Sequence, residues 1–193
     1  MPKNTAGRED GRNYDESLKM LESEEGQLNA VFAVFGSAVQ HSQHFEAAIT
    51  KFLLTRSKLS NQASNLEELQ ALETRFQRKT LGALLKEFRR YVSIKSEAVS
   101  ALLVAALERR NFLVHSFFLE REDKFGTESE RLELLSELAT IDHLLEQATV
   151  ATNAMELALR ETLEGKGDEI AEEQVVFSIE VHPPSSEDNP LHS

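Results

Sequence analysis

The sequence has 193 residues and no cysteine. This absence excludes a disulfide framework, a thiolate metal site and a cysteine nucleophile, and it favours a cytoplasmic location. Long apolar runs are also missing, because the longest nearly apolar stretch, AVSALLVAAL at 98–107, has ten residues. A bilayer crossing needs about 20. The polar first residues lack the apolar core of a signal peptide, so we expect neither secretion nor membrane insertion.

Several catalytic and metal-binding arrangements are absent as well. The eight glycines are scattered and none precedes a Lys-Ser or Lys-Thr pair, which excludes a phosphate-binding P-loop. None of the six histidines has a glutamate three residues before it, so the di-iron site of some helical bundles is excluded. His41 and His44 are spaced to share a helix face, but no third ligand can be identified, and an ordinary polar helix edge is favoured. We expect no metal and no cofactor.

Negative charge is concentrated at the two ends of the chain. The formal net charge is -12, of which residues 1–26 carry -3 and residues 161–193 carry -8, so residues 27–160 are nearly neutral. Within this neutral part, residues 75–95 hold seven Lys or Arg against one Glu. Such a segment is either a solvated helix face or a surface that follows an RNA backbone. The candidate RNA-binding residues are Arg75, Arg78, Lys79, Lys86, Arg89 and Arg90.

Apolar periodicity predicts an all-α protein. Residues 1–13 have no periodicity and are expected to be disordered, whereas apolar residues recur at helical spacing over 27–58. Further helices are expected over about 65–79, 81–92, from Ser96 through the following apolar run, and over 129–163. The phenylalanines of the first long helix are predicted to be core residues, not stacking surfaces for bases; they are Phe32, Phe35, Phe45 and Phe52.

Polar residues at the expected helix ends indicate caps. Ser64 or Asn65 and Thr80 each precede an apolar-periodic segment, and Thr127 with Glu130 has the spacing of a capping box after Gly126. Near the carboxyl end, EQVVFSIEVH at 173–182 alternates as a strand does, but we expect no second strand in this chain. The predicted architecture is an up-down bundle of four to five helices, with a helical domain over 14–164 and an acidic tail over 165–193.

The stretch ERRNFLVHSFF, Glu108 to Phe118, places polar groups inside an otherwise apolar helix. Burying such groups without partners costs several kcal/mol each. Asn111 and His115 are four residues apart and share a helix face, whereas Arg110 diverges from His115 by about 140° and is long enough to close that angle. A histidine can exchange protons near neutral pH and an arginine can grip phosphate, which together suit metal-free RNA cleavage.

A structural interpretation of the same residues stays open. Arg109 and Arg110 would then pair with glutamates at a helix edge, and His115 would pack against Phe117 or Phe118. In the structural interpretation these polar side chains are paired or packed within the protein. In the catalytic interpretation they are exposed to solvent.

The arrangement Arg110, Asn111, three residues and His115, near the end of a helix in a small all-α protein, resembles the signature of the HEPN superfamily. The segment KTLGALLKEF, 79–88, is similar to one that often precedes this signature in bacterial members. The resemblance implies a helical bundle that dimerises with two motif copies facing each other. It also implies a metal-independent endoribonuclease of a toxin or defence system, with Arg110, Asn111 and His115 as catalytic residues.

One position departs from a branch of that superfamily. Toxins paired with a nucleotidyltransferase antitoxin carry an adenylylated tyrosine two residues after the histidine, and here Phe117 has no hydroxyl group. Control by an antitoxin of that kind is therefore not expected, although an antitoxin or other protein partner is. Some HEPN-like domains are non-catalytic modules that bind protein or RNA, and this is the alternative to the enzyme.

Overall fold

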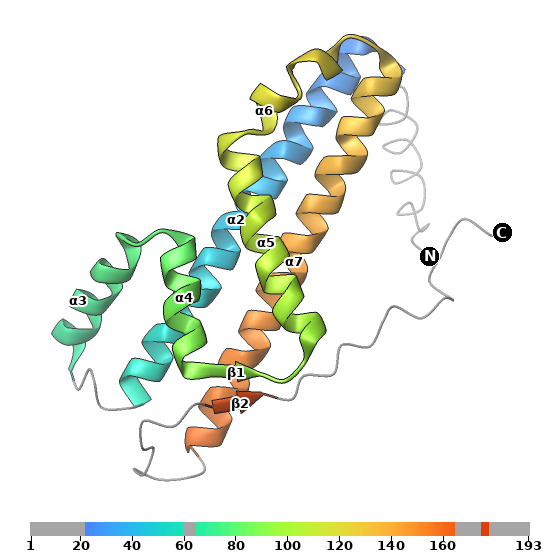
Figure 1. The fold of residues 1–193 in the computed structure, drawn as a ribbon. Coiled ribbons are helices and arrows are strands. Elements are labelled where there is room, and N and C mark those ends of the chain that lie inside the picture. The colour runs from blue at the N-terminus through green and yellow to red at the C-terminus, as the bar shows by residue number, and fades with distance from the viewer. Residues whose placement is uncertain (1–21, 60–64, 165–174, 178–193) are drawn as a thin grey trace, which may run out of the picture. The chain divides into compact units, whose positions relative to one another are not determined.

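The computed structural model describes residues 22–59, 65–164 and 175–177 (Figure 1). The predicted disordered segment 1–13 and most of the predicted acidic tail lie outside these residues. The described elements are, in order, α2 (Glu24–Leu59), α3 (Leu66–Gln77), α4 (Leu81–Tyr91), β1 (Val92–Ile94), α5 (Glu97–His115), α6 (Phe117–Glu120), the 3-10 helix η1 (Glu122–Phe125), α7 (Glu128–Glu164) and β2 (Val175–Phe177).

The all-α prediction is confirmed. Among the described residues, five helices have 11 residues or more, and α2 and α7 reach 36 and 37 residues. None of these helices combines the length and the apolar composition that crossing a membrane would need.

The helix boundaries follow from local capping chemistry. The Asn65 side chain accepts a hydrogen bond from the backbone N–H of Glu68 at 2.9 Å, and Thr80 caps α4 in the same way. Before α7, the Glu130 carboxylate accepts from the backbone N–H of Thr127 at 2.9 Å, while the Thr127 hydroxyl accepts from the N–H of Glu130 at 3.4 Å. This reciprocal pair is the predicted capping box, and it begins α7 where the sequence indicated.

The expectation that the carboxyl-terminal strand has no partner is wrong. β2 pairs in parallel with β1, with Val92 opposite Val175 and Ile94 opposite Phe177. The prediction failed because Val92 was assigned to the preceding helix, whereas its backbone is extended at φ -124° and ψ 122°. β-Branched Val92 and Ile94 suit an extended backbone, and a pairing of only three residues leaves little periodic signal.

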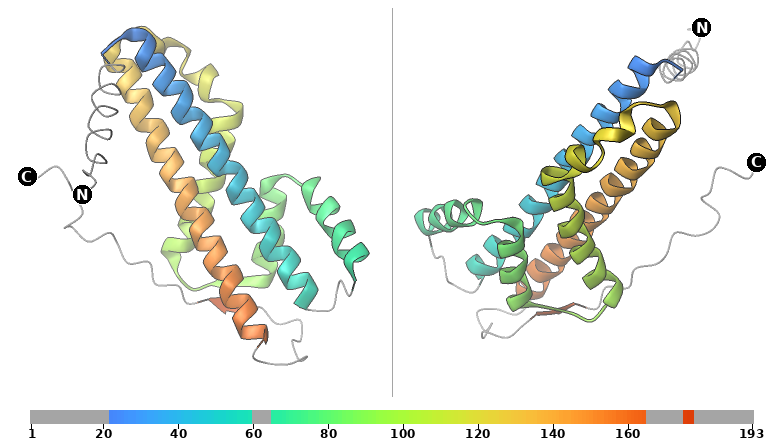
Figure 2. Two further views of the ribbon diagram at one scale, coloured as in Figure 1. Left: turned by 180° about the vertical axis from the view of Figure 1, so that it is seen from behind. Right: turned by 45° about the horizontal axis from the view of Figure 1, so that its top comes forward.

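The chain divides into two compact units, and α2, α5 and α7 each contribute residues to both. Unit 1 comprises residues up to Ser42 together with Arg109–Leu145. In it, the first halves of α2 and α7 lie side by side (Figures 1 and 2). They run in the same direction, because Gln27 contacts Arg131 and, further along both helices, His41 contacts Asp142. The core of unit 1 consists of Val31, Ala38, Leu113, Phe117, Leu134, Leu138, Ile141 and Leu145.

Unit 2 comprises Gln43–Glu108 and the residues from Glu146 onward. The Phe52 and Phe88 rings meet edge to face at 4.7 Å, which joins α2 to α4, and the Arg56 guanidinium lies 4.2 Å from the Tyr91 ring centroid. The second halves of α2 and α7 are joined by a buried carboxylate. Glu156, only 2% exposed, accepts from Thr55 at 2.8 Å, from Lys51 at 3.0 Å and from Arg160 at 2.6 Å.

Candidate functional site

The end of α5 presents the motif predicted from the sequence. Asn111 and His115 are exposed, and Arg110 is half-buried. His115 is the last residue of the helix, and the backbone N–H of Ser116 still donates to the carbonyl of Phe112 at 2.9 Å, so the helical path holds up to the histidine. In the structural interpretation, His115 would pack against Phe117 or Phe118. The imidazole lies at the surface, so His115 is not a core residue.

The Arg110 side chain turns toward Asn111. Its Nη1 donates to Asn111 Oδ1 at 3.3 Å. Because Asn111 and His115 share a face of α5, this bond brings the guanidinium toward the face that carries the imidazole, across the angle of about 140° that separates Arg110 from His115 on an ideal helix. The three residue types of the motif therefore belong to one exposed end of one helix.

Phenylalanine rings pack around Phe117, two residues after His115 of the motif. Phe117 is 1% exposed, and its ring centroid lies 5.6 Å from that of Phe35 and 5.8 Å from that of Phe112. Phe117 is thus a core position.

Phe32 contradicts its predicted place in the core. Phe45 and Phe52 are fully buried and Phe35 is half-buried, but Phe32 is 53% exposed. The ring of Phe32 lies 5.9 Å from that of Phe118, which is 39% exposed. Helical spacing predicts which residues share a face, but it does not show whether another element covers that face. We call Phe32, Phe35 and Phe118 the aromatic patch of unit 1.

In unit 1, a small cavity is lined by residues of α5 and α7, and an ion pair joins Arg121, at the end of α6, to Glu137 of α7. The Arg121 guanidinium donates to both carboxylate oxygens of Glu137, at 2.7 and 2.8 Å, and lies 5.1 Å from the Phe112 ring centroid. The hydrogen bonds from Arg121 lower the pKa of Glu137; burial opposes this shift, and the charges of Arg121 and Arg109 add to it. The cavity, of about 160 Å³, is lined by Arg109, Glu137, Thr140, Ile141 and Leu144. From the sequence, only a pairing with glutamates was considered for Arg109, and this cavity was not indicated, because four of the five lining residues come from α7.

The candidate RNA-binding residues lie in unit 2, on α3, α4 and the turn between them. Five of the six are exposed: Arg75, Arg78, Lys86, Arg89 and Arg90. The sixth, Lys79, is half-buried and contacts the Glu87 carboxylate. Burial lowers the pKa of Lys79, and the nearby charges of Arg75 and Arg90 lower it further. Desolvation is thus the main cause of this shift, and the repulsion from the two arginines adds to it.

The histidine pair considered for a metal is engaged otherwise. His41 Nδ1 lies 2.7 Å from Asp142 Oδ1, and the Ser37 hydroxyl donates to Asp142 Oδ2 at 3.3 Å. Within the described part of the chain, no group of three or more His, Asp and Glu residues is arranged to hold a metal ion. Sequence spacing did not indicate the Asp142 contact, because His41 and Asp142 are 101 residues apart.

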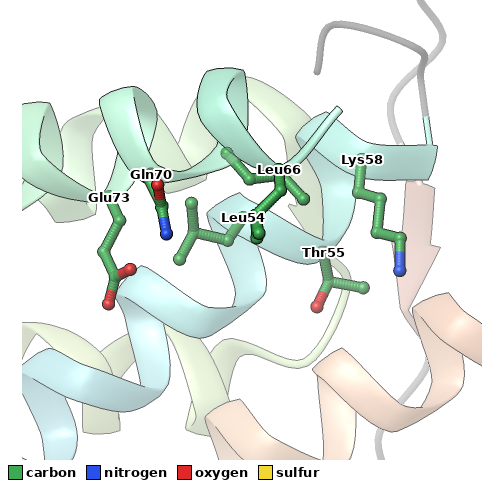
Figure 3. Close-up of a pocket in the computed structure, with 7 residues that line it drawn as sticks. Leu54, Thr55, Lys58, Leu66, Gln70 and Glu73 are labelled. Atoms are coloured by element: carbon green, nitrogen blue, oxygen red, sulfur yellow. The ribbon is translucent and has the colours of Figure 1, made fainter. Parts of the chain in front are cut away.

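A larger cavity occurs in unit 2 between the end of α2 and the start of α3. Its volume is about 250 Å³. Figure 3 shows Leu54 and Leu66 facing each other, with Gln70 and Glu73 on α3 and Thr55 and Lys58 on α2. Leu66 is 70% exposed, so this is a shallow gap beside a loosely packed helix end.

Comparisons with known proteins leave the chain unassigned. No family model matches it, and neither a curated protein nor a solved structure is significantly similar to it. Functional inference therefore depends on the residues of the site.

Proposed function

We propose that this protein is a cytoplasmic, metal-independent endoribonuclease of the HEPN type, from a toxin or defence system, that acts as a homodimer. In the reaction, the ribose 2'-hydroxyl attacks the adjacent phosphorus, the bond to the 5'-oxygen breaks, and a 2',3'-cyclic phosphate and a 5'-hydroxyl end form. His115 exchanges a proton with one of these oxygens, and Arg110 stabilises charge on the phosphate. Asn111 orients Arg110 or contacts the substrate.

The observation that carries the proposal is the hydrogen bond from Arg110 to Asn111 on the face of α5 that ends in His115. This bond turns the guanidinium toward the exposed Asn111 side chain. Solvent exposure of both Asn111 and His115 leaves them accessible to a macromolecular substrate. The side chains of a cleavage site must be reachable in this way.

Two further surfaces are compatible with RNA cleavage by a dimer. The exposed cations of α3 and α4 would neutralise RNA phosphates and release counterions, a contribution that needs no sequence recognition. Phe118 of the aromatic patch lies three residues after His115. The patch would bury apolar surface against a second copy of the chain. One proton donor and one acceptor, contributed by two copies of His115, would serve the two oxygens of the reaction.

The deciding experiment is incubation of the purified protein with RNA in the presence of EDTA. We expect cleavage to persist, and the products to carry 2',3'-cyclic phosphate ends. Sedimentation in the same buffer should give the mass of a dimer. A monomer, or RNA that stays intact, would remove the enzyme proposal.

A second candidate function is supported by the aromatic patch. Phe32 and Phe118 expose large apolar rings in a chain whose core already contains other phenylalanines, which is typical of a protein-binding surface. The protein would then be a non-catalytic helical module that binds a protein partner, such as an antitoxin, or RNA. It would bind RNA or protein equally well after His115→Ala, whereas an enzyme would lose cleavage.

A further inference from the structure

Exposed cations gather on one face of α4. Lys86 lies three residues before Arg89 and four before Arg90, so both arginines are its neighbours on the helix surface. The one acidic residue of this helix, Glu87, is half-buried and contacts Lys79. Like charges at this spacing repel one another, so an anionic partner on this face would be stabilising. We call Lys86, Arg89 and Arg90 the cationic face of α4.

The short sheet fixes the start of a further segment close to this helix. β1 begins at Val92, directly after α4 ends at Tyr91, and β2 pairs with β1 in parallel (Figure 1). Phe177, the last residue of β2, lies opposite Ile94. At about 3.3 Å for each residue of a strand, residues 178–193 therefore start about 10 Å from the end of α4.

The residues that follow β2 are acidic. Residues 178–193 contain no Lys or Arg and three acidic residues, Glu180, Glu187 and Asp188. Sixteen residues span up to about 50 Å, whereas the 11 residues of α4 extend about 16 Å. The segment is therefore long enough to turn back from the end of β2 along the whole of α4. We call residues 178–193 the acidic segment.

We propose that the acidic segment docks on the cationic face of α4 and competes there with RNA. Its carboxylates pair with the ammonium and guanidinium groups, and the tether through β2 gives the segment a high effective concentration at this face. Exposed ion pairs are individually weak, so RNA displaces the segment when many phosphates bind together. The regulatory role rests on the proposed function, whereas the docking does not.

The absence of cysteine allows a direct test of docking in the full chain. Ser185→Cys is combined either with Ala83→Cys, at an exposed position of α4 on the face of Lys86, or with Ala101→Cys, at an exposed position of α5 in unit 2. The tether alone does not favour Ala83, because β2 runs in parallel with β1, from the α4 end toward the α5 end.

The rate of disulfide formation in dilute protein reports the docking. At low salt we expect the pair with Ala83→Cys to form about tenfold faster than the pair with Ala101→Cys, because docking raises the local concentration. At about 1 M salt, where charges are screened beyond about 3 Å, the two rates should converge. Equal rates at low salt would overturn the proposal.

Charge variants show whether ion pairing holds the segment. The neutralised variant carries Glu180→Gln, Glu187→Gln and Asp188→Asn. In this variant the disulfide with Ala83→Cys should form as slowly as the one with Ala101→Cys. An unchanged rate would contradict docking by charge.

The same three substitutions, without the added cysteines, measure competition with RNA. The neutralised variant should bind RNA about tenfold more tightly than the wild-type protein at low salt, and the gain should disappear as salt rises. A matched control removes three exposed carboxylates elsewhere in unit 2, with Glu67→Gln, Glu97→Gln and Glu161→Gln. It should change the affinity by less than about twofold, because no tether brings these carboxylates onto the cationic face. Equal gains in both variants would reflect net charge alone and contradict the competition.

The outcomes separate this inference from the proposed function. Faster disulfide formation with Ala83→Cys in a protein that neither binds nor cleaves RNA would keep the docked segment and remove the enzyme. Cleavage of RNA with equal rates for Ala83→Cys and Ala101→Cys would keep the enzyme and remove the docked segment.

Discussion

In unit 1, three cations of the described residues meet acceptors: Arg121 is held by Glu137, Lys124 by Glu133 at 3.1 Å, and Arg131 by Gln27 and two backbone carbonyls. Residues 75–95 of unit 2 hold seven cations and a single acidic residue, Glu87, whose carboxylate contacts Arg75 and Lys79. The contacts in unit 1 engage three of its cations, while Asn111 and His115 of the motif are exposed; in unit 2, positive charge accumulates locally over residues 75–95. Under the proposed function, the end of α5 in unit 1 would supply the chemistry and residues 75–95 of unit 2 would supply affinity for phosphates.

The largest expected effect concerns His115. Replacing it with alanine should reduce RNA cleavage by about a thousandfold, within the range for loss of a general acid or base. The melting temperature and the dimer should be nearly unchanged, because an exposed imidazole contributes little to the core. Cleavage assays and thermal unfolding of the same preparation check both halves. If the free energy of unfolding of the variant instead falls by several kcal/mol, His115 has a structural role, and the proposed division of roles between the units is wrong.

Next in size is the effect of Arg131 on stability. Arg131 is 5% exposed and donates to Gln27 Oε1 at 2.8 Å and to the carbonyls of Phe125 and Gly126 at 2.9 and 3.2 Å. Arg131→Met would remove this donor from the buried Gln27 side chain and from the two carbonyls, and should lower the free energy of unfolding by about 3 kcal/mol in urea titrations. Arg78→Met in unit 2, at an exposed site, should change it by less than about 0.5 kcal/mol. Similar losses for both variants would contradict the contrast in how the units use arginine.

The Arg110 guanidinium gives the third prediction. Arg110→Lys keeps the charge but loses the planar fork that binds two phosphate oxygens, and it should reduce cleavage by about a hundredfold. If Arg110 and His115 serve one step, the double variant Arg110→Lys, His115→Ala should cleave no more slowly than His115→Ala alone. If the loss of cleavage in the double variant instead equals the product of the losses in the two single variants, Arg110 and His115 act independently.

Much of the fold was predictable because its determinants are local. The capping box of Thr127 and Glu130 and the cap at Asn65 involve residues three positions apart, so the sequence displays them directly. The pairing of β1 with β2 and the contact of His41 with Asp142 were missed, because they join residues 83 and 101 positions apart. No periodicity within one segment encodes such pairings.

The candidate site was predictable to a similar extent. Asn111 and His115 are four residues apart on α5, and Arg110 donates to Asn111; that Arg110 reaches toward His115 stays a prediction. The exposure of Phe32 and the cavity beside Arg109 were not predictable, since both depend on what lies opposite a helix. Hydrophobicity alone does not reveal whether a face is covered.

Glu156 of unit 2 makes the stability of the protein depend on acidic pH. Burial alone would raise its pKa, but hydrogen bonds from Arg160, Lys51 and Thr55 prevail, and the pKa lies below its ordinary value of 4.5. A carboxylate whose pKa is lowered by folding stabilises the protein above its unfolded pKa, and this contribution is lost as the pH falls through the folded value. Glu156→Gln should therefore make the free energy of unfolding fall less steeply below about pH 4.5, as measured by urea titrations from pH 7 to 3. An unchanged pH profile would show that the three hydrogen bonds do not favour the ionised form.

The smallest expected effect concerns single cations of unit 2. If Arg89, exposed on α4, contacts an RNA phosphate, Arg89→Ala should weaken RNA binding several-fold at low salt and reduce the slope of log K against log salt by about 1. The rate of cleavage at saturating RNA should stay the same, because Arg89 belongs to the charged surface and not to the motif. Arg89→Lys, which keeps the charge, should restore most of the affinity, since phosphate attraction at an exposed site depends mainly on charge. An unchanged salt slope in Arg89→Ala would mean that RNA does not follow this surface, and that the accumulated charge of unit 2 is only a solvated helix face.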